Sequence, residues 1–129
     1  MLGYALEGYM GRLLVHIATG PEHPTRAALG LLVARTALAE GHTVDLFFAG
    51  DGVGLLRPST LDAGMGIGTG SFREHADALV AGGATLYASG QSSKARGLGP
   101  DQIGGLPVQF SPPDVLVRLL FEADRNLTY

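Results

Sequence analysis

Residues 87–97 read Tyr-Ala-Ser-Gly-Gln-Ser-Ser-Lys-Ala-Arg-Gly, a stretch in which serine, glutamine, lysine and arginine are concentrated. An apolar run leads into it, and Gly90 interrupts that run. The pattern predicts the end of a buried strand, a tight turn and the start of a short helix. A junction of this kind directs backbone N–H groups and a helix N-terminus toward whatever lies above it.

Outward from this junction, apolar runs alternate with helical segments along the chain. Runs typical of buried strands occur at residues 12–19, 43–49, 84–89 and 106–110. Helical spacing and capping residues predict helices at residues 26–40, 72–81, 92–98 and 114–125, with Ser71 and Ser111 as N-caps. This alternation predicts right-handed crossovers and therefore an α/β fold whose parallel sheet is covered by helices on both faces.

Residues 50–70 are rich in glycine and poorly periodic, with one short helical turn expected before Pro58. The alternating glycines of residues 64–70 do not predict a dinucleotide site, because that motif directly follows the first strand and opens a helix. We predict instead a mobile flap or an interface loop, with Met65 and Ile67 as its apolar contact points.

Composition and charge limit the possible functions. The chain has 129 residues, nine basic and twelve acidic side chains and a net charge of −3, which argues against a general nucleic-acid binder. We expect residues 1–11 to form an N-terminal extension and residues 12–129 a single domain. No segment resembles a signal peptide or a membrane span, and no basic amphipathic segment suggests a membrane surface, so a cytoplasmic protein is predicted.

Cysteine is absent, which excludes a disulfide, a thiolate nucleophile and a persulfide carrier within this chain. The sequence predicts no metal site and no cofactor, because the histidines lie in four different elements without paired spacing: His16, His23, His42 and His75. His16 lies within a strand and is expected to be a satisfied core or interface histidine.

The carboxyl ends of parallel strands meet at one edge of a sheet, and ligands bind there at a switch point in strand order. This edge gathers the candidate ligand-binding residues, which are Thr19, Glu22, His23, Asp51, Ser89, Gly90, Gln91, Ser92, Ser93, Lys94 and Arg96. Their backbone N–H groups, hydroxyls and cationic groups would suit a small polar or anionic molecule.

Structural interpretations of these residues remain open. Ser92 or Ser93 can cap the short helix, and Asp51 can hold its own turn. Lys94 and Arg96 are two positions apart on a helix and therefore point in different directions. A serine with His23 and Asp51 would make a hydrolase-like set, but the sequence lacks the G-x-S-x-G elbow, so no catalytic residue is assigned.

Two segments carry a resemblance to a known family. Residues 41–53, Gly-His-Thr-Val-Asp-Leu-Phe-Phe-Ala-Gly-Asp-Gly-Val, resemble the helix-turn-strand-G-D-G-V segment of the DsrE/DsrF-like family. The strand at residues 84–89, followed by Gly-Gln-Ser-Ser-Lys-Ala-Arg-Gly, is similar to the same family. The likeness extends over residues 12–125, nearly the whole chain.

The resemblance implies a three-layer α/β/α fold with a mainly parallel sheet of four to five strands. It also implies assembly into trimers, hexamers or complexes with a related subunit. Several relatives carry persulfide sulfur on a cysteine at this strand end, where the present sequence has Ser89, Ser92 and Ser93. We therefore expect a non-catalytic binding or accessory protein, or else a sulfur-relay subunit whose partner supplies the cysteine.

Overall fold

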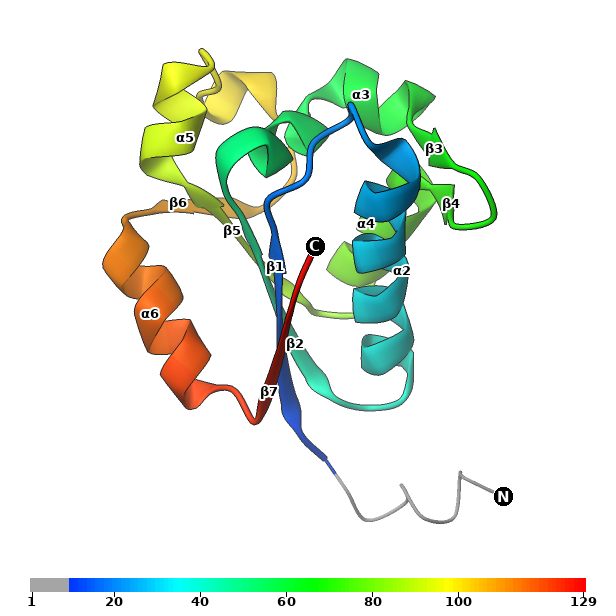
Figure 1. Cartoon of the computed structure of the whole chain (residues 1–129), viewed down its shortest axis with the longest axis vertical. Helices are drawn as coiled ribbons and strands as arrows, with labels where there is room; N and C mark the ends of the chain where they lie inside the picture. Colours follow the sequence, from blue (N-terminus) through cyan, green and yellow to red (C-terminus); the bar gives the residue numbers. More distant parts are fainter. Residues whose placement is uncertain (1–9) are drawn as a thin grey trace.

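The computed structural model describes residues 10–129, which form a five-stranded sheet in the order β6-β5-β2-β1-β7 (Figure 1). All four neighbouring strand pairs are parallel. The predicted α/β fold with a mainly parallel sheet of four to five strands is thereby confirmed. The strands are β1 (Arg12–Ile17), β2 (Thr43–Phe48), β5 (Thr85–Ser89), β6 (Val108–Ser111) and β7 (Arg125–Thr128).

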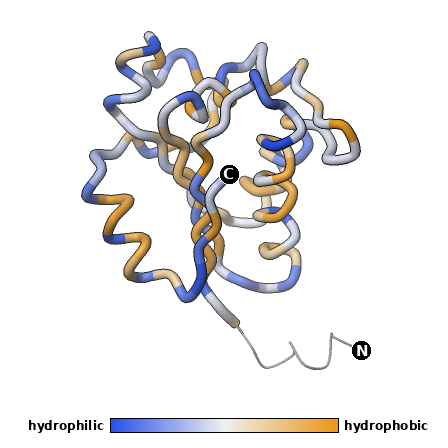
Figure 2. The backbone as a smooth tube through the Cα atoms, in the orientation of Figure 1, coloured by the Kyte–Doolittle hydropathy of each residue, from blue (hydrophilic) through white to orange (hydrophobic). Residues whose placement is uncertain are grey.

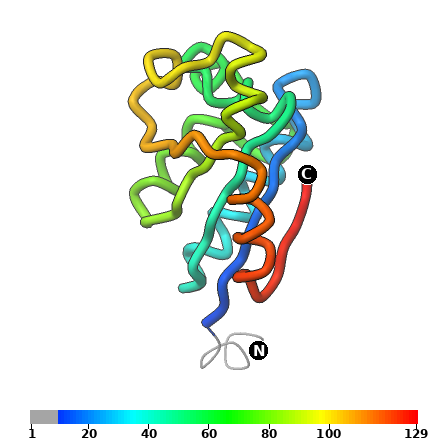
Figure 3. Tube along the Cα trace, turned by 90° about the vertical axis from the view of Figure 1, so that its left-hand side faces the viewer, coloured from blue at the N-terminus to red at the C-terminus, as the bar shows by residue number. Residues whose placement is uncertain are grey.

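Helices lie on both faces of the sheet, as predicted. The helices α2 (Pro24–Ala39) and α4 (Phe72–Ala81) cover one face, and α6 (Pro113–Glu122) covers the other (Figures 1 and 3). The strand order explains this distribution. The chain moves from β1 to β2 and on to β5 in one direction, but from β6 it returns across the sheet to β7. Because both kinds of crossover are right-handed, the returning helix must lie on the opposite face.

Two apolar cores result from this arrangement. The larger core packs α2 and α4 against alternate residues of the strands, such as Val15, Leu46 and Leu86. The smaller core packs α6 against the opposite face through Leu14, Phe47 and Leu119. Consecutive residues of β1 and β2 therefore enter different cores, which is why both strands are continuously apolar in the sequence.

The glycine-rich segment is more ordered than predicted. It contains the 3-10 helix η1 (Gly50–Leu56), the helix α3 (Pro58–Ala63) and a hairpin of β3 (Met65–Gly66) and β4 (Gly70–Ser71). The Ile67 N–H donates to Thr25 Oγ1 over 3.0 Å, and Thr69 Oγ1 donates to the Thr25 carbonyl over 3.1 Å. These bonds attach the hairpin to α2, and its role as a flap or an interface loop stays a prediction. Met65 and Ile67 are nonetheless exposed.

The structure confirms one predicted helix cap and corrects the other. Ser71 Oγ accepts the Glu74 N–H at 3.2 Å, as expected for the start of α4. Ser111 is not a cap, because it is the last residue of β6 and pairs with Ser89. Its hydroxyl donates to the Gln109 carbonyl, and Pro112 precedes the first turn of α6 without a side-chain cap.

His16 lies on the α6 face of β1 and packs edge-to-face with Phe47 at a centroid distance of 6.3 Å. Its Nε2 atom is buried without a hydrogen-bond partner among the described residues. Its Nδ1 atom lies 3.5 Å from Thr128 Oγ1, so one ring nitrogen has a partner and the other has none among the described residues. Burial lowers the pKa of His16 below its ordinary value of 6.5, because a charged ring at this position would lose hydration.

This pKa shift makes the stability of the fold depend on pH. The unfolded chain takes up a proton at His16 near pH 6.5, whereas the folded chain does so only at lower pH. The stability that comes from the neutral His16 ring is fully present above pH 6.5. It is lost as the pH falls from 6.5 through the lowered pKa of the folded chain. We expect the free energy of unfolding of wild type, relative to that of His16→Leu, to fall as the pH is lowered from 7.5 to 5. Urea unfolding at several pH values measures this difference, and parallel curves for the two proteins would contradict it.

Candidate functional site

Two loops lie in close contact at the carboxyl ends of β1 and β2. A Cβ atom at Gly52 would overlap the carbonyl oxygen of Ile17, and one at Gly20 would press on the carbonyl oxygen of Asp51. Glycine is therefore required at both positions by close backbone approach. This contact fixes the loop after β2 relative to the end of β1, and with it the position of Asp51.

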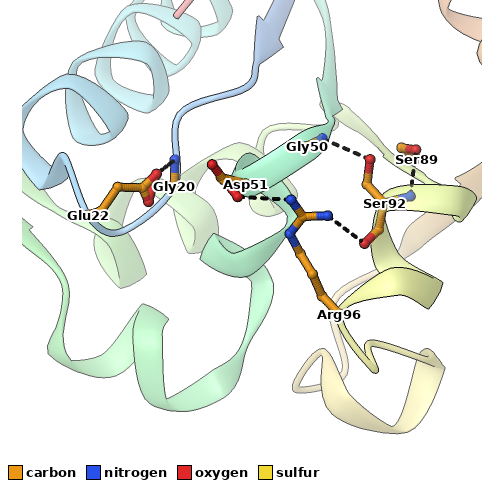
Figure 4. Close-up of polar contacts among 7 residues, drawn as sticks. All are labelled: Gly20, Glu22, Gly50, Asp51, Ser89, Ser92 and Arg96. Atoms are coloured by element: carbon orange, nitrogen blue, oxygen red, sulfur yellow. Dashed lines mark hydrogen bonds and ion pairs between the residues drawn. The ribbon is translucent and has the colours of Figure 1, made fainter.

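The serines at the end of β5 are held by backbone N–H groups (Figure 4). Ser89 Oγ accepts the Ser92 N–H at 3.1 Å and so caps the short helix α5 (Gly90–Ala95). Ser92 Oγ accepts the Gly50 N–H at 2.9 Å, which joins α5 to the loop after β2. The prediction that Ser92 or Ser93 caps this helix is wrong, because α5 begins at Gly90, directly after the strand.

Arg96 connects the same two segments through its charged group. Its Nη2 donates to Asp51 Oδ1 over 2.9 Å, and its Nη1 donates to the Ser92 carbonyl over 3.1 Å (Figure 4). Arg57 Nη2 in turn donates to the Arg96 carbonyl over 2.6 Å. The Arg96–Asp51 ion pair is exposed, so it contributes only about 0–1 kcal/mol to stability. Its main consequence is that the charge of Arg96 is already paired.

The three candidates in the loop after β1 are separate from this cluster. Glu22 Oε1 accepts the Gly20 N–H at 2.9 Å and thus stabilises its own turn. The Thr19 N–H donates to the Tyr129 carbonyl, and His23 is the exposed N-cap residue of α2 without a side-chain cap bond. Across residues 10–129, no hydrogen bond joins His23 to Ser89.

The remaining candidates of α5 differ in exposure. Ser93 is only 2% exposed, and its buried hydroxyl has no partner within the described part of the chain. Gln91 and Lys94 are exposed, and Lys94 makes no ion pair with any described residue. Gly90 is the first residue of α5. The structure therefore brings together Asp51, Ser89, Ser92 and Arg96 and leaves Lys94 on another side of the helix.

Sequence reasoning missed three participants. The Gly50 N–H and the Tyr129 carbonyl are backbone groups, and their roles depend on where the loops pack. The sequence around Arg57 gives no indication, apart from its charge, that its side chain bonds the Arg96 carbonyl.

The order of the strands reverses between β1 and β7, whereas the linked side chains lie at the ends of β2 and β5. The polar cluster thus lies beside the switch point of the sheet and not within it.

Tyr87 precedes this cluster by two positions on β5 and stacks on Phe47 at a centroid distance of 6.2 Å. Burial, with the Asp45 carboxylate as a second cause, raises the pKa of Tyr87. The phenol is therefore protonated at neutral pH and supplies no base.

Among residues 10–129, no group of three or more potential ligands is placed to hold a metal ion, and no helix has the length and apolarity to cross a membrane.

Comparison with known proteins gives a family and two similar folds. The sequence model of the DsrE/DsrF-like family matches residues 12–129. The crystal structure of the ychN protein from E. coli has 17% identity, covers 93% of this chain and 99% of its own, and superposes with a TM-score of 0.76. MTH1491 from Methanobacterium thermoautotrophicum, a protein of unknown function, has 20% identity, covers 92% and 99%, and gives a TM-score of 0.70. No curated protein matches the chain.

The surroundings of Ser89 predict the behaviour of a thiol at that position. A thiolate in Ser89→Cys would accept the Ser92 N–H at the start of α5, which lowers the thiol pKa below its usual value of about 8.5. The pH dependence of alkylation by iodoacetamide measures this pKa, and the chain has no other cysteine to interfere. Ala95→Cys, exposed near the other end of the helix, is the control and should titrate near about 8.5. A midpoint for Ser89→Cys at or above the control would contradict the prediction.

Proposed function

The chain belongs to the DsrE/DsrF-like family, and on this basis we propose that it is a non-catalytic binding or accessory protein of the DsrE type. It assembles with copies of itself, as a trimer or hexamer in the cytoplasm, and binds a small polar or anionic ligand at the carboxyl edge of its strands. The observation that carries the proposal is the structural use of Ser89 and Ser92, whose hydroxyls accept backbone N–H groups where a thiol would be needed for sulfur transfer.

The chemistry of these groups supports a binding role over a catalytic one. The chain has no cysteine, and a serine hydroxyl has no accessible anionic form near neutral pH. A serine nucleophile needs a base within about 2.6–3.2 Å. Among the described hydrogen bonds, the hydroxyls of Ser89 and Ser92 engage only backbone N–H groups, so a Ser/His hydrolase receives no support.

The ligand part of the proposal rests on the polar groups at the ends of β2 and β5. Serine hydroxyls that accept a hydrogen bond retain their own proton as a donor. Ser89 and Ser92 therefore can each donate to an anionic or carbonyl oxygen without losing their present bonds. No cofactor is needed for this kind of recognition.

A ligand screen tests this part. Sulfate, phosphate, nucleotides and small thiols are added separately, and the midpoint of thermal unfolding is measured. We expect at least one of them to raise it, since a ligand at 100 times its dissociation constant adds about 2.7 kcal/mol to the free energy of unfolding. Amide resonance shifts confined to residues 18–23, 49–52 and 89–96 would place the site. The absence of any shift, or shifts confined to other regions, would contradict the proposal.

Self-assembly is supported by the outer face of α6. Val117 is 51% exposed and Phe121, four residues later on the same side, is 88% exposed. Figure 2 shows the apolar character of this helix. Since neighbours at this spacing form one stripe, the exposed phenyl ring is part of a continuous apolar surface of the kind that marks protein interfaces.

The assembly predicts a specific effect of charge on this stripe. Light scattering coupled to size-exclusion chromatography should give a trimer or hexamer for wild type and a smaller species for Phe121→Glu, because a carboxylate loses hydration in an apolar interface. Leu29→Glu is the matched control, since Leu29 is 38% exposed on α2, which covers the opposite face of the sheet from α6. A monomeric wild type, or an assembly that Phe121→Glu leaves intact, would contradict the prediction.

The second candidate is a subunit of a sulfur-relay complex whose partner supplies the cysteine. The missing thiol and the apolar stripe of α6 favour it equally well. Co-purification with a cysteine-bearing relative would support this candidate, whereas a stable assembly of this chain alone would favour the first.

A further inference from the structure

A groove of about 520 Å³ lies between α5 and β6, next to the strand edge. Its lining includes Gly90, Lys94, Gly97, Leu98, Pro100 and Phe110. Gly90, Lys94 and Gly97 follow one another at intervals of four and three residues, which places them along one side of α5 and its C-terminal turn. Ser92 and Arg96 use another side of the same helix, so the groove is separate from the cluster with Asp51.

The groove combines an apolar wall with one available cation. Leu98, Pro100 and the half-buried ring of Phe110 supply the apolar surface. Lys94 is exposed and has no ion pair in the part of the chain that the structure describes, whereas the charge of Arg96 is paired with Asp51. The groove therefore presents one compact positive charge beside an apolar surface.

Gly90 supplies a second argument, because the fold does not require glycine there. Its φ is not positive, and the atoms nearest to an added Cβ would be the Ser111 carbonyl oxygen at 3.7 Å and the Ser111 nitrogen at 4.0 Å. A methyl group at this position would thus make ordinary contacts with the protein. Glycine in a helix costs stability relative to alanine, so its presence instead leaves the groove without a side chain at this point.

We propose that this groove binds a small organic anion with a flat apolar body, of the class of an aromatic carboxylate. The carboxylate lies at the Lys94 ammonium group, and the ring lies against Phe110 and Pro100. A single ammonium group suits a monoanion, and the volume falls within the range of about 300–1,000 Å³ that is typical of small-molecule sites. This inference rests on the proposed binding role. It specifies the class of ligand for the groove between α5 and β6, which lies next to Ser89 at the carboxyl edge of the sheet.

Titration with 2-naphthoate, followed by amide resonances of the whole chain, tests the inference. We expect saturable shifts at residues 90, 94, 97–99 and 110. The neutral isostere 2-naphthalenemethanol should bind at least about fivefold more weakly, and acetate should produce no saturable shift, because each lacks one of the two recognised groups.

Variants at two positions, Lys94 and Gly90, separate the effect of the charge from that of the shape of the groove. Lys94→Gln should weaken 2-naphthoate at least about fivefold, and Lys94→Arg should retain most of the affinity. Gly90→Ala should weaken binding by occupying the groove while leaving the unfolding temperature unchanged or slightly raised. Arg118→Gln, which removes another exposed cation on α6, is the control and should bind like wild type.

The inference is overturned if 2-naphthoate binds Lys94→Gln and Gly90→Ala as it binds wild type, or if its shifts do not saturate. Binding of inorganic anions at residues 89–92 without binding of 2-naphthoate would overturn this inference and leave the proposed function intact. Binding of 2-naphthoate in the groove, with no response to any inorganic anion, would support the inference and contradict a separate anion site at Ser89.

Discussion

Right-handed crossover connections decide where each helix of this chain lies. The chain moves from β1 through β2 and β5 to β6 in one direction and then returns across the sheet to β7, which pairs with the other side of β1. The return places α6 alone opposite α2 and α4, as Figures 1 and 3 show. Only the inner side of α6 packs against the sheet, so its outer side, which carries Phe121, is left exposed. The exposed stripe on α6 is thus linked to the order of the strands.

The same topology brings polar groups together at the carboxyl edge, but hydrogen bonding decides what they can do. Ser89 and Ser92 accept backbone N–H groups in positions that a thiolate would also occupy. A backbone N–H stabilises a negative charge, yet a hydroxyl at neutral pH carries none. Backbone N–H donors therefore point at neutral serine oxygens in this chain. The hydroxyls of Ser89 and Ser92 can bind an external anion without any change in their protonation.

Local patterns allowed the sequence to predict the four strands and four helices that carry apolar runs or capping residues. The fifth strand, β7, could not be predicted, because its four residues are all exposed and only pairing with β1 makes them a strand. For the site, strand ends predicted the region, and Asp51 and Arg96 do meet there. Sequence could not show that Glu22 bonds within its own turn, or that the Gly50 N–H reaches Ser92, because these contacts depend on loop packing.

The two sides of α5 make different contributions to recognition. On the side of Ser92 and Arg96, hydrogen bonds fix the helix to the loop after β2, and the charge is paired. On the side of Gly90 and Lys94, the helix makes no such bonds within the described residues, and its charge is available. A rigid attachment on one side holds the other side at a defined distance from Phe110, which reduces the entropy lost when a ligand is bound. The cluster of Asp51, Ser92 and Arg96 would then act chiefly as the support of a binding surface on the other side of α5.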